Sequence, residues 1–441
     1  MRKSISCPNL ELMRYGIREI VDVTQQLQAL DPSLQVMGEN IGDPVAKGWD
    51  VPDFIREILA GLIRSDARQV FAYTHSRGRI ETRKWVVDYA RRFSPSARLD
   101  YEQVVFVNGL GAGISIIYRM LAPGVRVLQP HPGYPTHISS ERFHAGLESI
   151  GYRLDPGRQW QPDLDHLEFQ VKRNPDVAGI LLINPNNPTG AVYTEDVLEA
   201  VLRIAERYRL MVISDEVYFR MVFNQAHYVQ ITELAKARVP LLVMRGVSKD
   251  VPWPGARCGW LEFHNADRDL EFQAYFESIK KSVMLEVCST SLPQTALPLI
   301  YDHPEFERWL SRYCADLETN SNAIYAILSR TKGIHVIPIQ GAFYMTILFD
   351  EGILNNRQTL PIANPKSAEF IRRIVAGSNI LLDKRFAYYL LAATGICVVP
   401  ATDFESPRPG FRVTMLERDP GRRDRTYQRL AEAIAHYLAS G

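Results

Sequence analysis

Three segments of the sequence place chemically active side chains beside turns rich in glycine or proline. They are NPNNPTG (184–190), SDEVY (214–218) and GVSKDVPWPGARCGW (246–260). We expect them just beyond the carboxyl ends of parallel strands, where open α/β sheets bind ligands. Their polar side chains, among them Asn187, Asp215 and Lys249, would then lie along one edge of the sheet.

Each segment taken alone also has a purely structural interpretation. NPNNPTG can be only a turn, since Asn, Pro and Gly dominate turns for conformational reasons. Asp215 and Glu216 can be a solvated strand end, and Lys249 can be an ordinary surface lysine. In this order and spacing, the three segments together indicate a ligand site far more specifically than any one of them.

The elements that must position these residues form an alternating pattern. Continuous apolar runs at 178–183, 210–214 and 240–244 predict buried strands of a parallel sheet. Residues 195–208 carry one apolar stripe at helical spacing, and Thr194 is a candidate N-cap residue. The pattern is typical of an α/β domain with a mainly parallel central sheet between helices.

The rest of the chain follows a different pattern. We predict a long helix from about 304 to 331, a terminal helix at 423–438, and strands at 333–339, 341–349, 395–400 and 411–415. This predicts a large α/β domain over 51–304 and a smaller α+β domain over 305–441. Residues 1–50 are expected to form an N-terminal arm and part of the small domain.

Composition narrows the function classes. The chain has 441 residues and a formal net charge of +1, which gives no electrostatic argument for binding nucleic acid or an anionic membrane. Its five cysteines are scattered and include no Cys-x-x-Cys pair, which argues against a disulfide framework or a structural zinc site and for a reducing compartment, and we expect no metal. The longest apolar stretch, 388–401, is too short to span a bilayer. We therefore expect a cytoplasmic protein with a small-molecule ligand.

From about residue 15 to residue 416 the sequence resembles the class I and II (fold type I) aminotransferases, and its motifs are most similar to the alanine-aminotransferase-like branch. The resemblance implies the cofactor pyridoxal 5'-phosphate (PLP). Lys249 matches the lysine that holds PLP as a Schiff base, and Asp215 matches the aspartate that pairs with the pyridine nitrogen. Asn187 and Tyr218 match the residues that bind the ring oxygen.

The same resemblance implies a phosphate site. Arg257 lies eight residues after the lysine, where the family keeps an arginine, and Leu110 and Gly111 belong to the matching phosphate turn. Tyr134 matches the aromatic residue that stacks on the pyridine ring. Many members have a serine at the position of Gly246, and we expect Ser248 to supply that hydroxyl instead.

Substrate residues follow from the resemblance too. Arg412 in GFRVTML matches the arginine that binds the substrate α-carboxylate, beside Asn187, and Gly42 in NIGDP matches a close backbone approach to that carboxylate. The alternative for Arg412 is a surface arginine of a strand. Tyr73 resembles the tyrosine that reaches the phosphate of a neighbouring subunit, which implies a homodimer with shared sites; its alternative is a core aromatic.

Tyr15 and Arg18, in YGIREI, resemble residues near the substrate pocket, and Arg18 is equally well interpreted as a residue of a surface helix. Two features depart from the family pattern. Trp253-Pro254 is bulky and rigid for its place between the lysine and Arg257. The polar start of segment 350–383 is interpreted as a flap over the pocket.

The resemblance favours an enzyme that moves an amino group between an L-amino acid, alanine or a similarly small or hydrophobic one, and a 2-oxo acid such as 2-oxoglutarate. The alternative is a PLP-dependent lyase, either a carbon–sulfur β-lyase or a cyclising lyase, because these enzymes share the cofactor residues. A third hypothesis, a non-enzymatic binding or regulatory protein, is disfavoured because Lys249, Asp215, Asn187, Tyr218 and Arg412 are all present.

Overall fold

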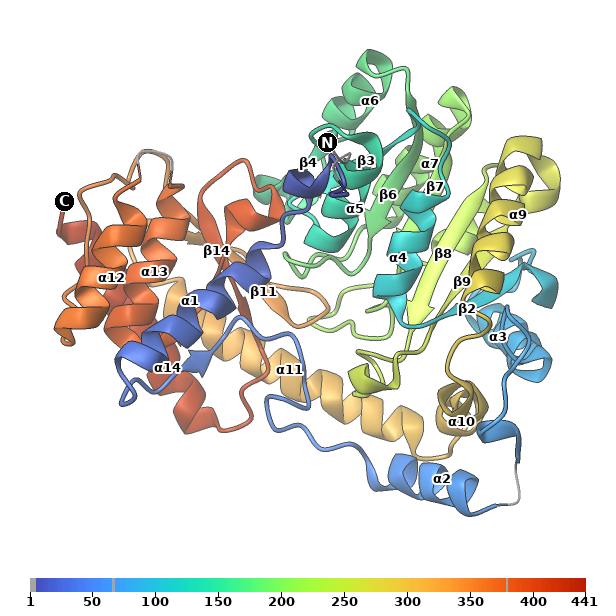
Figure 1. Cartoon of the computed structure of the whole chain (residues 1–441), viewed down its shortest axis with the longest axis horizontal. Coiled ribbons are helices and arrows are strands. Elements are labelled where there is room, and N and C mark those ends of the chain that lie inside the picture. Colours follow the sequence, from blue (N-terminus) through green and yellow to red (C-terminus); the bar gives the residue numbers. More distant parts are fainter. Residues whose placement is uncertain (1–4, 66–67, 378–379) are drawn as a thin grey trace.

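The computed structural model describes residues 5–65, 68–377 and 380–441. An eight-stranded sheet lies at the centre of the larger part of the molecule (Figure 1). Neighbouring strands lie in the order β2-β9-β8-β7-β6-β3-β4-β5. Their bounds are β2 (Val104–Val107), β3 (Arg126–His131), β4 (Gly151–Asp155), β5 (Gln161–Pro162), β6 (Val177–Ile183), β7 (Met211–Asp215), β8 (Leu241–Gly246) and β9 (Gly259–His264). From β8 across to β4 the strands are parallel, whereas β9 is antiparallel to both of its neighbours and β5 is antiparallel to β4. The expected α/β fold with a mainly parallel sheet is confirmed.

Helices cover both faces of this sheet because alternate strand residues point to opposite sides. Leu182 and Val212 pack in one apolar cluster with α6, α7 and α8. Leu181 and Ile213, each one residue away in sequence, pack in another cluster with α4 and α9. The bounds of these helices are α4 (Leu110–Arg119), α6 (Leu164–Arg173), α7 (Glu195–Tyr208), α8 (Ile231–Ala235) and α9 (Leu270–Leu285). Buried on both faces, the strands read as continuous apolar runs in the sequence.

The other half of the molecule is built around a four-stranded antiparallel sheet in the order β10-β11-β14-β13. Its strands are β10 (Ile334–Val336), β11 (Tyr344–Phe349), β13 (Val399–Pro400) and β14 (Gly410–Thr414). The start of the chain joins this half, since β1 (Met37–Gly38) pairs in parallel with β12 (Ile396–Cys397). Figure 1 shows α1, coloured blue, beside the orange and red helices.

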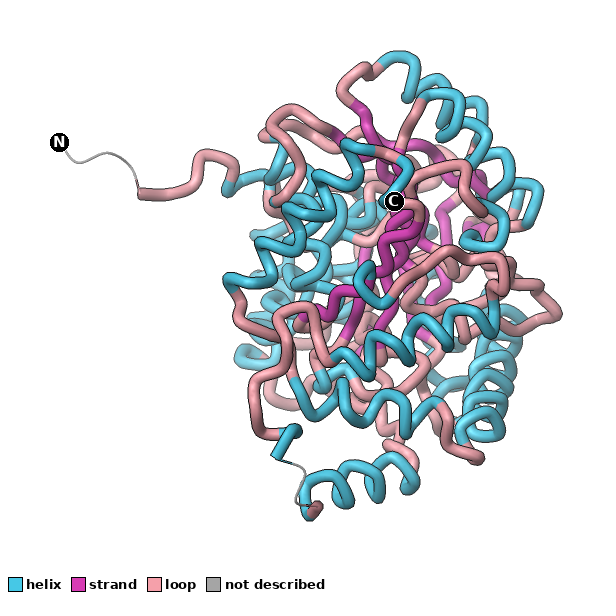
Figure 2. Tube along the Cα trace, turned by 90° about the vertical axis from the view of Figure 1, so that its right-hand side faces the viewer, coloured by secondary structure: helices cyan, strands magenta, loops and turns pink. Residues whose placement is uncertain are grey.

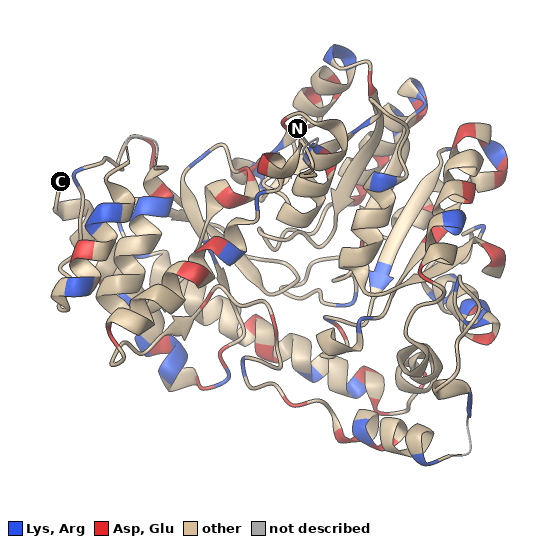
Figure 3. Ribbon diagram, viewed as in Figure 1, with Lys and Arg blue, Asp and Glu red and all other residues tan. Residues whose placement is uncertain are grey.

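The remaining helices surround and connect the two halves (Figures 1 and 2). They are α1 (Gly16–Leu30), α2 (Asp53–Arg64), α3 (Ile80–Phe93), α5 (Pro135–Ala145), α10 (Ser291–Tyr301), α11 (Phe306–Leu328), α12 (Pro365–Val375), α13 (Leu382–Thr394) and α14 (Pro420–Ala439). Helix α11 packs on α14 and runs toward α10 and α2. Among the described helices, none combines the length and the apolar composition needed to cross a membrane. Basic and acidic side chains are intermixed over the elements (Figure 3).

Most predicted elements are confirmed, and the differences have physical causes. The helix predicted at 195–208 is α7 with those bounds, although the Thr194 side chain makes no capping hydrogen bond. The strand predicted at 333–339 ends at Val336, and Pro338 beyond it has no N–H to continue a ladder. The strand predicted at 395–400 is two short strands, because β12 pairs with β1 and β13 pairs with β14.

Candidate active site

A cavity of about 200 Å³ lies at the carboxyl ends of β6, β7 and β8. It gathers nine of the predicted site residues together with five other residues. The predicted residues lining it are Leu110, Gly111, Tyr134, Asn187, Asp215, Tyr218, Ser248, Lys249 and Arg257. The others are Ile114, Ile183, Val217, Pro254 and Tyr344. The parallel strand ends therefore bring together segments that are far apart in the chain.

One end of the cavity suits an anion. Gly109, with a φ of +77°, turns the chain from β2 into α4, so the free N–H groups of the first turn of α4 face this end. The Arg257 guanidinium lies against the turn, since a Cβ at Gly109 would stand 2.5 Å from its Nη2. Arg257 Nη1 also donates to the Pro254 carbonyl at 3.1 Å, so the unusual Trp253-Pro254 pair helps to orient this arginine. Ser248 lines the same cavity.

Asp215, the last residue of β7, is held from behind by a chain of hydrogen bonds. Its Oδ2 lies 3.2 Å from His137 Nε2, and His137 Nδ1 lies 3.2 Å from the Tyr118 hydroxyl. That hydroxyl accepts a hydrogen bond from Gln129 at 3.0 Å. The sequence reasoning missed His137, although it lies one helical turn after Tyr134 at the start of α5, a spacing that places both on one face.

Lys249 follows β8 on a half-buried turn and reaches across to the start of the chain. Its Nζ donates to the Gly42 carbonyl at 2.7 Å, over 207 positions of sequence. Gly42 must be glycine in this arrangement, because a Cβ there would stand 2.0 Å from the Tyr344 hydroxyl. The backbone at Gly42 thus lies close to Lys249 and Tyr344, and its expected approach to the substrate carboxylate stays a prediction.

Arg412, on β14, is buried, and its hydrogen bonds go to neutral acceptors. Its side chain is 1% exposed, donates to Asn187 Oδ1 at 3.2 Å and to the Asn40 carbonyl at 2.7 Å, and has an Nε without a partner. No ion pair with a carboxylate joins it within the described ranges. Burial lowers the pKa of Arg412. The surface-arginine alternative is wrong: Arg412 is buried, and it contacts Asn187 and Tyr344, which line the cavity.

Of three further predicted residues, Tyr15 lies at the cavity, whereas Arg18 and Tyr73 lie away from it. The Tyr15 hydroxyl is 3.4 Å from that of Tyr134, so Tyr15 stands at the edge of the cavity. Arg18 is exposed and is not among the residues that line the cavity. Tyr73 is 84% exposed, which excludes the alternative of a core aromatic in this chain, and it does not reach the cavity of its own chain.

The flap predicted over 350–383 does not cover this site. None of its described residues lines the cavity, and its helix α12 lies at the outer edge of the molecule beside α13 (Figure 1). Its polar start folds back on the C-terminus, where Gln358 Nε2 donates to the Leu438 carbonyl at 3.5 Å and Thr359 N donates to Ser440 Oγ at 2.9 Å. Local polarity could not distinguish this packing from a pocket cover.

Tyr344 is the main polar residue that the sequence reasoning missed. It begins β11, and its hydroxyl accepts a hydrogen bond from Tyr218 at 3.3 Å. The Arg412 guanidinium lies over its ring, 4.2 Å from the centroid. Burial alone raises the pKa of Tyr344, but Lys249 and Arg412 outweigh burial and lower it below its ordinary value. Nothing in Gly341-Ala-Phe-Tyr indicates these neighbours in advance.

Comparisons with known proteins agree with this geometry. The family model for aminotransferases of class I and II matches residues 38–434. The chain is 42% identical to an uncharacterised aminotransferase of Methanocaldococcus jannaschii, over 99% of this chain and 100% of that protein. It is 33% identical to an S-alkyl-thiohydroximate lyase of Arabidopsis thaliana, over 52% of this chain and 49% of that one. The structure of an alanine aminotransferase from Pyrococcus furiosus superposes with a TM-score of 0.83 at 26% identity, covering 98% of this chain and 99% of that one.

Proposed function

The chain belongs to the class I and II aminotransferase family, and we propose that it moves an amino group between L-alanine, or a similarly small or hydrophobic L-amino acid, and a 2-oxo acid such as 2-oxoglutarate. It is a PLP-dependent aminotransferase. The observation that supports the proposal is the cavity itself: Lys249 and the buried Asp215 line it, and the buried Arg412 contacts Asn187 and Tyr344 of its lining.

The residues present fit PLP. The N–H groups at the start of α4 with Arg257 and Ser248 would hold its phosphate, and Tyr134 would lie on its ring. Asp215 would hold the proton on the ring nitrogen, while Asn187 and Tyr218 would bind the ring oxygen. Lys249 would form the covalent link. When bound, PLP supplies an aldehyde and an electron-accepting ring that weakens the bonds to the substrate α-carbon.

The chain's own residues would then bind and orient the substrate. Arg412 would pair with the α-carboxylate, because its planar fork matches a carboxylate and it has no competing anion in the described part of the chain. Asn187, already bonded to Arg412, would hold the guanidinium in place. The Lys249 amine, once displaced by substrate, would carry the proton that leaves one carbon and joins the other.

The preference for alanine-like substrates is supported by the structural similarity to an alanine aminotransferase over nearly the whole chain. Tyr15 and Tyr134 would border the substrate side chain. The lyase alternative draws on a relative that matches only about half of either chain, whereas the aminotransferase relative matches along the full length. No specific contact in the cavity favours elimination, so that reaction is kept as an outcome of the test below.

We further propose that two copies form a homodimer with shared sites. Exposed apolar side chains gather near the anion end of the cavity, at Phe71, Tyr73, Met284, Leu285 and Val287. Two hydrogen bonds tie these segments to the site: Ser291 Oγ donates to the Val70 carbonyl at 2.8 Å, and Asn108 donates to Glu286 at 3.3 Å. Such a patch fits burial against a second copy, and Tyr73 would reach the partner's phosphate. Leu285→Asp should convert the dimer to monomers in sedimentation, while Leu270→Asp on the same helix should not.

The proposed cellular setting is the cytoplasm, since all five cysteines are unpaired thiols. We also propose that residues 51–304 and 305–441 act as separate large and small domains, with residues 1–50 as an arm and part of the small domain. Their apolar side chains form one extended cluster that joins both parts, so any relative motion would occur across a packed interface.

The decisive experiment follows the visible absorbance of the PLP-loaded protein with each L-amino acid in turn. We expect alanine to bleach the cofactor band and release one 2-oxo acid per site, and 2-oxoglutarate to restore the band. Lys249→Ala should abolish the cycle, whereas Lys281→Ala, on the surface helix α9, should leave it intact. Continuous release of pyruvate and ammonia without an oxo-acid acceptor would instead establish the lyase.

A further inference from the structure

Behind Asp215, buried side chains form one chain of hydrogen bonds that starts at a backbone carbonyl. Gln129 Nε2 lies 3.0 Å from the Val127 carbonyl and 3.0 Å from the Tyr118 hydroxyl. The Tyr118 hydroxyl lies 3.2 Å from His137 Nδ1, and His137 Nε2 lies 3.2 Å from Asp215 Oδ2. Gln129, Tyr118 and His137 are at most 1% exposed, so these neighbours, and not bulk solvent, set the direction of each hydrogen bond.

The Val127 carbonyl fixes the start of this chain. A carbonyl oxygen only accepts, so the Gln129 atom beside it must be the amide nitrogen, whose second N–H then points to the Tyr118 hydroxyl. Turning the amide over would place two carbonyl oxygens 3.0 Å apart and would take both N–H groups away from their acceptors. The Gln129 amide oxygen has no partner in the described structure, and one unmet acceptor costs less than two unmet donors.

The Tyr118 hydroxyl passes this direction on to His137. It already accepts from Gln129, so its own proton needs an acceptor, and within the described ranges His137 Nδ1 is the acceptor at hydrogen-bond distance. His137 Nδ1 must then present a lone pair, which places the imidazole proton on Nε2, facing Asp215 Oδ2. Turning the ring over would put carbon atoms at both contacts.

We propose that Tyr118 and Gln129 are positioning residues that fix the proton of His137 on Nε2, so that Asp215 always meets a donor on its protein side. Asp215 Oδ1 also accepts from the Val217 N–H at 3.3 Å, so both carboxylate oxygens receive donors. With the other tautomer, the Nε2 lone pair would face Asp215 Oδ2, which favours a carboxyl group that keeps a proton of its own.

The consequence concerns the cofactor. A carboxyl group that keeps its own proton is less able to hold one on the ring nitrogen of PLP, and the cofactor then withdraws electrons less strongly. This inference rests on the proposed function, because it assumes that the PLP ring nitrogen lies beside Asp215, which lines the cavity. Tyr118, Gln129 and His137 themselves lie behind Asp215 and are not among the lining residues.

The test locates the protons of His137 by nitrogen NMR of the PLP-loaded protein with isotope-labelled histidine, and the His137→Asn spectrum identifies its signals. In the wild type we expect an unprotonated Nδ1 and a protonated Nε2. Gln129→Glu offers, in nearly the same volume, a buried carboxylic acid that donates to the Val127 carbonyl and accepts from Tyr118. The Tyr118 oxygen then faces His137 as an acceptor, so Nδ1 should become protonated.

The cofactor and the kinetics supply further readouts. With isotope-labelled PLP, the ring-nitrogen signal should shift toward the unprotonated form in Tyr118→Phe, which removes the donor to His137 Nδ1 and keeps the aromatic ring. In the same variant kcat for the amino acid should fall about 10-fold, with KM within about twofold of the wild type. Tyr152→Phe is the matched control, because its equally buried hydroxyl donates to the Leu181 carbonyl at 2.8 Å, and it should keep the wild-type signals and kcat.

Three results would overturn the proposal: a wild-type His137 with its proton on Nδ1, a folded Gln129→Glu protein in which Nδ1 stays unprotonated, or a Tyr118→Phe protein whose ring-nitrogen signal and kcat equal those of Tyr152→Phe. The proposed function fails separately. If no amino acid changes the wild-type cofactor band, transamination is refuted, whereas the histidine spectra still decide whether Tyr118 and Gln129 fix the proton of His137.

Discussion

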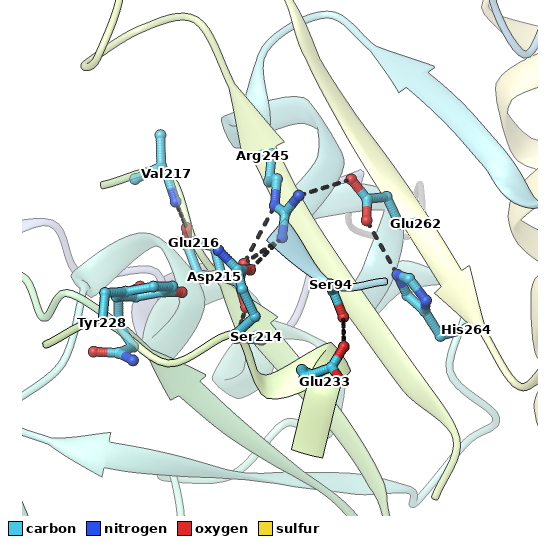
Figure 4. A network of polar contacts seen from close by, with 12 residues as sticks. Ser94, Ser214, Asp215, Glu216, Val217, Tyr228, Glu233, Arg245, Glu262 and His264 are labelled. Atoms are coloured by element: carbon cyan, nitrogen blue, oxygen red, sulfur yellow. Dashed lines mark hydrogen bonds and ion pairs between the residues drawn. The ribbon is translucent and has the colours of Figure 1, made fainter. Parts of the chain in front are cut away.

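Two buried arginines, Arg245 and Arg412, have opposite surroundings. Arg245, at 2% exposure on β8, donates to Glu216 Oε2 from Nε and Nη2 at 3.2 and 2.8 Å, and its Nη1 lies 3.6 Å from Glu262 (Figure 4). Burial lowers the pKa of Arg245, but the two carboxylates outweigh it and raise that pKa. Arg412, equally buried, has an amide oxygen and a backbone carbonyl as acceptors, and burial lowers its pKa.

The difference separates a structural charge from a binding charge. Around Arg245, further hydrogen bonds reach the two glutamates. Trp260 and His264 contact Glu262 at 2.8 and 3.1 Å, and Ser214 donates to Glu216 at 3.0 Å. That cluster joins β7, β8 and β9 through paired charges, although Arg245 Nη1 has an ion pair with Glu262 and no hydrogen bond. Burying a charge without its counter-ion costs free energy, so an uncompensated arginine persists where a ligand completes it. We propose that Arg412 is of this second kind.

The largest effect is expected from Arg245→Met. Removing this guanidinium leaves Glu216 and Glu262 buried without their cation, which should lower the free energy of unfolding by about 3–5 kcal/mol in urea titrations. Adding Glu216→Gln and Glu262→Gln to Arg245→Met should recover most of the loss. The half-exposed pair Arg238–Glu199 provides the control, because Arg238→Met should cost at most about 1 kcal/mol. Equal losses of unfolding free energy for Arg245→Met and Arg238→Met would contradict the greater structural role of the buried cluster.

Arg412→Met should affect activity strongly and stability little, the opposite of Arg245→Met. We expect the free energy of unfolding to stay within about 1 kcal/mol of the wild type, since a buried charge without a counter-ion is removed. In contrast, kcat/KM for the amino acid should fall by about 10²-fold, with the cofactor absorbance retained. Arg412→Lys should recover little, because the planar fork is lost. Arg429→Met on the exposed side of α14 serves as control, and an Arg412→Met enzyme with normal kcat/KM contradicts the binding role.

Asp250 extends the comparison to a buried carboxylate without an ion pair in the described chain. It accepts hydrogen bonds from the Tyr301 hydroxyl at 3.0 and 2.9 Å, and burial raises its pKa to about 6. The folded protein then holds a proton that the unfolded chain has lost, so stability falls as pH rises from about 4 to 6. The loss attributable to Asp250 is about 3 kcal/mol.

Asp250→Asn should remove this part of the pH dependence, and urea titrations at several pH values would measure it. Asp403, whose pKa burial also raises to about 6, contributes equally to both proteins and cancels in the difference. A difference between the two proteins that stays constant from pH 4 to 6.5 contradicts the assignment.

The smallest effect concerns the hydroxyl that completes the Arg245 cluster. Ser214→Ala removes the hydrogen bond to Glu216 and should lower the free energy of unfolding by about 1 kcal/mol. Ser278→Ala, on the exposed face of α9, should change it far less, because that hydroxyl only donates to a carbonyl of its own helix. Identical values for the two variants would show that the cluster does not depend on its outer hydrogen bonds.

The sequence predicts the cofactor side of the site better than the substrate side. Lys249, Asp215 and Asn187 follow directly on buried strands, so the rule that parallel strand ends share one edge is enough to place them together. His137 and Tyr344 become neighbours of the cavity only through the packing of α5 and β11, which no local pattern encodes. The supposed flap at 350–383 failed for the same reason: polarity marks exposure, but it does not say which surface a segment covers.

The contact between the Asn40 carbonyl and Arg412 joins residues 372 positions apart, and the one between Gly42 and Lys249 spans 207. During synthesis on the ribosome, the segment that holds these carbonyls emerges long before β14 and must wait for it. The strands and turns of the anion-binding end also emerge before β14. A nascent chain can therefore complete the proposed cofactor end of the cavity before Arg412, the residue proposed to bind the amino acid, has been synthesised.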